Sequence, residues 1–103
     1  MENVNYSVPA IISGGIVNSK AINFVQPQYS PEVTNNTEFK GKVYVEVIID
    51  EQGIVTTASY ISGNPLLKMA VEAAAKQTKF SQTNLLGQNV KVKGIIVYNL
   101  AGN

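Results

Sequence analysis

The sequence contains neither cysteine nor histidine, and these absences remove several kinds of functional site. Without cysteine there is no disulfide framework and no thiolate nucleophile, and without both residues there is no zinc site of the usual kind. No imidazole is present to act as a base. Acid–base chemistry would depend on seven scattered carboxylates, lysine or tyrosine. We therefore expect no enzyme, no metal and no cofactor.

Arginine is also absent, and the basic and acidic residues nearly balance, giving a formal net charge of +1. A nucleic-acid-binding protein would normally carry a basic excess and arginine forks for phosphate, so no nucleic-acid partner is expected. No apolar run approaches the ~20 residues that span a bilayer. A chain of 103 residues is typical of one domain with a modest core.

The N-terminal third carries weak local signals. Residues 1–12 are mixed in character and are interpreted as a flexible N-terminal arm, which leaves residues 13–103 as the domain. Pro27 and Pro31 hold the residues before them in an extended conformation. A short helix is expected to begin at Pro31, and it should be weak because the Asn- and Thr-rich sequence after it favours turns.

The middle of the chain gives the clearest signals. Alternation of apolar and polar residues predicts a half-buried strand over 40–50, and a turn at 50–53 followed by a β-branched run over 54–62 predicts a hairpin. Asn64 then caps a helix whose apolar stripe faces the core and which should end near Thr78. The predicted core consists of Val43, Val45, Val47, Ile49, Leu67, Ala70, Val71, Ala74, Phe80, Val92 and Ile96.

The last part of the chain completes the fold class. Residues 81–89 are polar and predict a loop, and residues 90–100 predict a final strand. The order strand–strand–helix–strand predicts an α+β fold. It consists of a small antiparallel three-stranded sheet with one main helix packed on one face, preceded by the extended segment and the weak helix. Because the final strand follows a loop, we expect it at a sheet edge with one row of backbone groups unpaired.

Two groups of residues invite a functional interpretation. Glu46, Asp50 and Glu51 could form a carboxylate cluster, but acidic residues are ordinary in a hairpin turn, and catalysis is not expected. The extended segment Gln26–Tyr29 is harder to explain structurally, because a pure linker needs no aromatic residue. A peptide-contact surface is the hypothesis for this segment.

Seven segments occur in a recognisable order and spacing: Gly14–Ile22, Gln26–Glu32, Gly41–Gly53, Ser62–Leu67, Ala70–Ala74, Lys79–Ser81 and Gly87–Val92. As a set they resemble the C-terminal domain of the TonB family of energy transducers in bacterial outer-membrane transport. The resemblance covers about residues 13–100, and the family's order of elements is the one predicted above.

This resemblance implies a non-enzymatic periplasmic domain that engages a short extended peptide of outer-membrane receptors. It also implies energy transmission from an inner-membrane proton-driven complex. The family's domain is normally tethered to the inner membrane by an N-terminal helix and a proline-rich spacer. Neither is in this sequence, so we expect an excised domain. The alternative is a structural or sensor module of the envelope, attached to another membrane protein, with peptidoglycan as a contact.

The expected mode of binding is addition of the receptor peptide as a further strand beside the last strand. Its lysines would deter self-pairing and attract an acidic peptide, and the two glutamines of the extended segment would supply hydrogen bonds. The predicted partner-binding residues are Gln26, Pro27, Gln28, Tyr29, Val90, Lys91, Val92, Lys93 and Ile95. Because residues 1–25 and the last strand lack local hairpin partners, exchange of strands between two copies predicts a homodimer.

Overall fold

The computed structural model describes residues 11–29 and 41–100. The helix expected at Pro31 and the first ten residues of the expected arm lie outside the described residues. Residues 11 and 12 of that arm lie in a strand, β1 (Ile11–Ile16).

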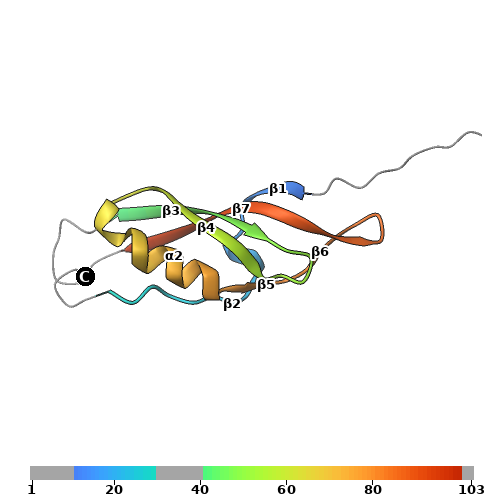
Figure 1. Ribbon diagram of the computed structural model, residues 1–103, viewed down its shortest axis with the longest axis horizontal. Coiled ribbons are helices and arrows are strands. Elements are labelled where there is room, and N and C mark those ends of the chain that lie inside the picture. Colours follow the sequence, from blue (N-terminus) through green and yellow to red (C-terminus); the bar gives the residue numbers. More distant parts are fainter. Residues whose placement is uncertain (1–10, 30–40, 101–103) are drawn as a thin grey trace, which may run out of the picture.

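A five-stranded mixed sheet forms the body of the domain (Figure 1). Its main strands are ordered β1–β7–β3–β4, where β7 is Gln88–Leu100, β3 is Gly41–Ile49 and β4 is Val55–Ser62. β3 pairs antiparallel with β4 and β7, whereas β1 runs parallel to β7. The α+β class with one main helix is confirmed. The three-stranded antiparallel sheet is wrong, because β1 adds a parallel strand and places β7 inside the sheet.

The stretch expected as a loop over 81–89 contains the fifth strand, β6 (Thr83–Leu85), which pairs antiparallel with β7. Leu86 and Gly87 connect the two strands with φ angles of 54° and 83°. Two consecutive positive φ angles are typical of the type I′ hairpin turn. Leucine is unusual in this turn, so the hairpin has no clear signature in the sequence.

The β3–β4 hairpin agrees with the sequence pattern. The Asp50 carboxylate accepts hydrogen bonds from the backbone N–H groups of Gln52 and Ile54, both at 2.9 Å, and so closes the turn. Gly53 has a φ of 86°, and any Cβ there would collide with the Phe80 carbonyl group. Glycine is therefore required both by its conformation and by the close approach of the chain.

The main helix lies over β3 and β4. A 3₁₀ turn, η3 (Pro65–Leu67), leads into α2 (Lys68–Gln77), and the Asn64 side chain accepts a hydrogen bond from the Leu66 N–H at 3.0 Å. Glu72 of α2 accepts a 2.8 Å hydrogen bond from the Tyr60 N–H of β4. The helix is thus fixed to the sheet by a polar contact as well as by packing.

Apolar side chains between α2 and the sheet form one core. Of the predicted core residues, all are buried except Ala70, which is half-buried. The buried cluster comprises Val17, Val43, Val45, Val47, Ile49, Val55, Leu67, Val71, Ala74, Ala75, Phe80, Val92, Ile96 and Tyr98.

A second, two-stranded sheet ties the N-terminal segment to the end of α2. After β1, the chain forms a 3₁₀ turn, η1 (Asn18–Lys20), and then β2 (Ala21–Asn23), which pairs antiparallel with β5 (Lys79–Phe80). The Ser81 N–H donates a 2.9 Å hydrogen bond to the Lys20 carbonyl. The extended segment that follows β2 runs alongside α2 (Figure 1).

Candidate peptide-docking edge

The backbone groups of β7 alternate between its two sides. The Ile95 carbonyl accepts a 2.9 Å hydrogen bond from the Val17 N–H, and Val97 is bonded on the same side to Asn18. Pairing of β3 with β7 has no register shift, so this alternation continues along the strand. Odd-numbered residues of β7 therefore direct their backbone groups away from β3. We call this row, from Lys91 to Asn99, the outward edge of β7.

β1 covers the first half of the outward edge. Its residues pair with Lys91–Ile95, and the register shifts between Ser13 and Gly15. The expectation that the last strand offers a free edge is therefore wrong over this stretch. The sequence could not reveal this, because the two partners are about 80 positions apart in the chain.

Two glycines allow this close packing. A Cβ on Gly14 would lie 2.7 Å from Cγ1 of Val92, and a Cβ on Gly94 would collide with the Val17 side chain. Val17 is completely buried, and it fills the space that Gly94 leaves free. The two glycines thus let β1 lie against β7 while the next residue enters the core.

The Asn18 side chain closes the outward edge at its middle. Its amide nitrogen donates to the Val97 carbonyl at 2.8 Å, and its amide oxygen accepts from the Val97 N–H at 2.9 Å. A side-chain amide thus takes the place that the peptide groups of a neighbouring strand would occupy.

A pocket opens beyond Val97. It has a volume of about 400 Å³, and Asn99 at this end is exposed. The pocket is lined by Asn18, Ala21, Phe24, Gln26, Val97, Tyr98 and Asn99.

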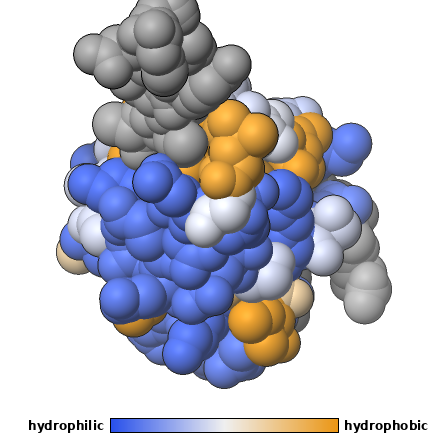
Figure 2. All heavy atoms as spheres, turned by 90° about the vertical axis from the view of Figure 1, so that its right-hand side faces the viewer, coloured by the Kyte–Doolittle hydropathy of each residue, from blue (hydrophilic) through white to orange (hydrophobic). Residues whose placement is uncertain are grey.

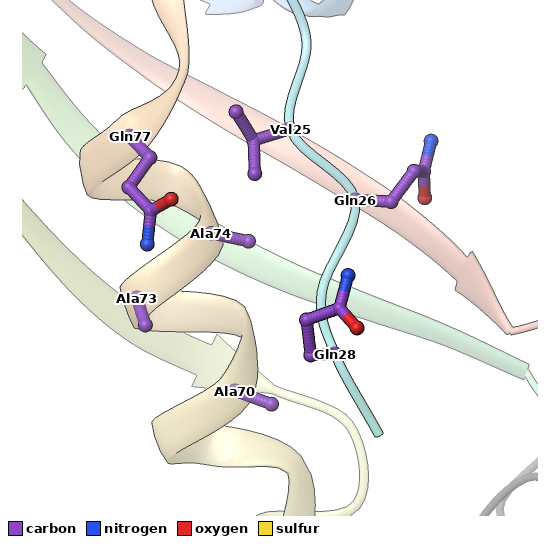
Figure 3. A pocket seen from close by; sticks show the side chains of 7 residues that line it. All are labelled: Val25, Gln26, Gln28, Ala70, Ala73, Ala74 and Gln77. Carbon is purple, nitrogen blue, oxygen red and sulfur yellow. The ribbon is translucent and has the colours of Figure 1, made fainter.

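The extended segment Gln26–Tyr29 begins at this pocket, which Gln26 lines, and continues beside α2, where Figure 3 shows Gln26 and Gln28. Figure 3 shows the Val25 side chain directed toward α2 and the Gln26 side chain directed away from it. Gln28 lines a smaller space of about 170 Å³ beside the alanine face of α2. Tyr29 is half-buried against the core, so packing explains the aromatic residue of this segment.

Thr78 and Tyr98 fix the beginning of the segment. The Thr78 hydroxyl accepts a 3.1 Å hydrogen bond from the Val25 N–H and donates to the Ala74 carbonyl at 3.0 Å. The rings of Phe24 and Tyr98 pack with their centroids 5.5 Å apart. The segment is therefore anchored to α2 and to β7 before it reaches Gln26.

Burial sets the ionisation of the two tyrosines near this anchor. It raises the pKa of Tyr98 to about 12 and also raises the pKa of Tyr29. The Tyr98 hydroxyl is buried without a hydrogen-bond partner. Thr78 lies close enough to favour the ionised form slightly, but its one hydroxyl hydrogen is already bonded to Ala74. Burial is therefore the dominant effect, and both hydroxyls stay neutral at physiological pH.

The surface around the outward edge is polar, with two exposed lysines. Lys91 and Lys93 are exposed, and Lys93 forms an ion pair with Glu46 at 3.6 Å. Figure 2 shows the end of the molecule that carries the β6–β7 hairpin as a mainly hydrophilic surface with separate hydrophobic patches.

The described residues contain neither a cluster of metal ligands nor a membrane-spanning helix. Within residues 11–29 and 41–100, no three His, Cys, Asp or Glu side chains lie close enough together to hold a metal ion. No helix in the same ranges is long and apolar enough to cross a membrane.

The structure separates the predicted partner-binding residues into two groups. Lys91, Lys93 and Ile95 direct backbone groups to the outward edge, whereas Val90 and Val92 have buried side chains and backbone groups directed to the other side. From the extended segment, Gln26 lies at the Asn99 end of the edge, Pro27 is half-buried, and Gln28 and Tyr29 lie along α2.

Sequence reasoning missed the residues that close the outward edge. Asn18 was not singled out, although a polar residue directly after an apolar run could have suggested a strand-end cap. The parallel strand β1 carries no such signal, because Gly14 and Gly15 read as a turn.

Comparison with known proteins adds the family. Residues 25–100 match the family model described as the Gram-negative bacterial TonB protein C-terminal. No curated protein and no solved structure matches the chain. The matched family consists of non-enzymatic, periplasmic interaction domains that serve TonB-type energy transduction in outer-membrane transport. Since the match spans most of the chain, including α2 and strands β3 to β7, this protein belongs to the TonB C-terminal domain family.

Proposed function

We propose that this domain binds an extended segment of an outer-membrane transport receptor as an added strand on the outward edge of β7. It then passes on energy from a proton-driven complex of the inner membrane, to which it is tethered in the periplasm. The observation that carries the proposal is that β1 lies along this edge in parallel orientation, so a receptor segment would take the place of β1. The backbone geometry for strand addition is thus present in the folded domain.

The length of the edge suits a short peptide. The stretch that β1 covers, from Lys91 to Ile95, extends roughly 13 Å, at about 3.3 Å per residue, and the Asn18 side chain closes the edge beyond it at Val97. At the far end, the pocket beside Asn99 and Gln26 offers side-chain amides for further hydrogen bonds. A bound segment would therefore run from the lysines toward the pocket.

Charge favours an acidic segment. Lys91 and Lys93 are exposed beside the edge, and lysines at a strand edge also oppose pairing with a second basic edge. Glu46 already pairs with Lys93, so the net attraction comes mainly from Lys91. Because both lysines are exposed, salt should weaken this contribution.

The affinity of such a contact should be modest. Four or five backbone hydrogen bonds contribute ~0.5–1.5 kcal/mol each, and association costs several kcal/mol of lost freedom. Micromolar binding of the isolated peptide follows, which suits a contact that must form and release.

Proline substitution tests the proposal through the alternation of β7. Lys93→Pro removes an N–H group from the outward edge, so it should abolish binding of a receptor peptide and leave the domain folded. Val92→Pro removes an N–H group bonded to β3 and should unfold the sheet. Calorimetric titration with peptides from outer-membrane receptors measures the first effect, and circular dichroism measures the second. Unchanged peptide binding by a folded Lys93→Pro variant would contradict strand addition at this edge.

A further inference from the structure

β1 lies on the proposed docking edge but outside the part of the chain that matches the family. The match begins at Val25, whereas β1 ends at Ile16. The strand covers the backbone groups that a partner strand would need.

β1 is held much less firmly than the residues that follow it. None of its six residues is fully buried: Ile12 is half-buried against the core, and Ile11 and Ile16 are 41% and 62% exposed. Directly after it, Val17 is completely buried, and Asn18 makes two hydrogen bonds to Val97. Detaching β1 therefore removes no fully buried side chain, whereas detaching the next two residues would open the core.

The middle of β1 is also irregular. The pairing with β7 shifts between Ser13 and Gly15, and Gly15 has a φ of 64°. A shift interrupts the ladder of hydrogen bonds, so β1 is held by two short stretches of pairing rather than one continuous stretch.

We propose that β1 is an internal strand that closes the outward edge of β7 and leaves it when a partner strand binds. The link between Ile16 and Val17 serves as the pivot, while Val17 and Asn18 stay in place. The identity of the partner rests on the proposed function, but the closure does not. An incoming strand runs parallel to β7 and needs a small residue at the place of Gly14, because a side chain there meets Val92.

Release of β1 can be tested with β1 itself as the probe. A labelled synthetic peptide with the sequence of residues 9–16 should bind the native chain weakly, because the attached strand competes at a high effective concentration. In Gly14→Val, the attached strand is excluded by Val92, so the apparent dissociation constant of the probe should fall at least tenfold. Ser13→Val is the matched control. It adds the same side chain at an exposed position, and probe binding should not change.

A disulfide gives the opposite test. Ser13 and Lys93 are register partners, both are exposed, and they line the same groove, while the chain has no cysteine of its own. In Ser13→Cys/Lys93→Cys, oxidation should lock β1 in place and abolish probe binding, and reduction should restore it. Comparing the two redox states of one variant cancels the effect of the substitutions themselves.

The outcomes separate the closure from the identity of the partner. If the oxidised and reduced forms of the double variant bind the probe equally, β1 does not close the edge. The disulfide experiment is sufficient by itself to test the closure if Gly14→Val fails to fold. If Gly14→Val binds the probe tightly but binds no receptor peptide, the closure is supported and the proposed function is wrong.

Discussion

Leu86 adopts a backbone conformation that leucine rarely takes. Its φ is 54°, and its side chain is 75% exposed, so no packing offsets the strain of a positive φ. This strain amounts to about 1 kcal/mol for a residue with a Cβ. Asparagine tolerates the same conformation and is the preferred residue before glycine in a type I′ turn.

We therefore expect Leu86→Asn to raise the free energy of unfolding by about 1 kcal/mol. Chemical denaturation measures this change as a shift of the midpoint at an unchanged slope. Leu66→Asn is the control, since Leu66 is exposed to a similar degree, 77%, and has no positive φ. A gain of the same size in both variants would mean that loss of an exposed leucine, and not the turn, causes it.

Ionisation of Tyr98 should lower the free energy of unfolding at alkaline pH. Its pKa is about 12 in the folded domain because it is buried, against about 10 for an unfolded tyrosine. The unfolded chain therefore loses this proton first. The contribution of the neutral, buried Tyr98 to the free energy of unfolding is fully present below pH 10. It is lost as the pH rises toward 12, by an amount on the order of 2 kcal/mol. Tyr29, whose pKa is also raised by burial, acts in the same direction.

Tyr98→Phe should remove most of this alkaline loss. Below pH 9 the variant should be at least as stable as the native chain, because the lost hydroxyl has no hydrogen-bond partner. Urea unfolding at pH 8 and pH 11 measures the difference. Tyr44→Phe, on the other face of the sheet, is the control, and equal pH dependence in both variants would contradict the assignment to Tyr98.

Among the elements, those with a local signature could be predicted and those that depend on distant partners could not. The β3–β4 hairpin and α2 are specified by their own periodicity, by the Asp50 turn and by the Asn64 cap. β1 is specified by residues about 80 positions away in β7. Without β1, β7 would be an edge strand, so the missing β1 accounts for the wrong position of β7, and the missing β6 accounts for the remaining strand.

The same division applies to the candidate site. Period-two alternation within the last strand is a local signal, so an alternation of outward backbone groups could be predicted, but the sequence does not decide whether Val92 or Lys93 directs them outward. The contact between Asn18 and Val97 spans 79 positions, and no pattern in the sequence connects them. The aromatic Tyr29 invited a functional interpretation, whereas its half-buried position beside the core gives it a packing role.

The hydrogen bonds between Asn18 of η1 and Val97 of β7 should stabilise the fold. Asn18→Ala leaves the partly buried N–H and carbonyl of Val97 without partners, and this should cost on the order of 1–3 kcal/mol. Thermal unfolding followed by circular dichroism measures the loss. Ser19→Ala, one position along in η1 and exposed, should have no such effect. If both variants unfold at the same temperature as the native chain, the Asn18 amide does not stabilise the edge of β7.

For the molecule as a whole, the β1–β7 pairing allows two copies to exchange β1. The same contacts form between chains as within one chain, so the exchange needs no new interface. We expect a concentration-dependent dimer in sedimentation experiments. Oxidised Ser13→Cys/Lys93→Cys should then give covalent dimers at high protein concentration and intramolecular disulfides at low concentration. Monomers alone at millimolar concentration, with no covalent dimer, would contradict the exchange.

Parallel pairing at the outward edge also determines how the contact responds to force. A partner segment bound as β1 is bound would lie along β7 across Lys91–Ile95. Tension along the strand axis loads all of its backbone bonds together in shear, so they must break at the same time. Tension across the axis loads only the outermost bond, and the segment peels away one residue at a time. The same few bonds can thus resist an axial pull and yet release quickly when the pull changes direction.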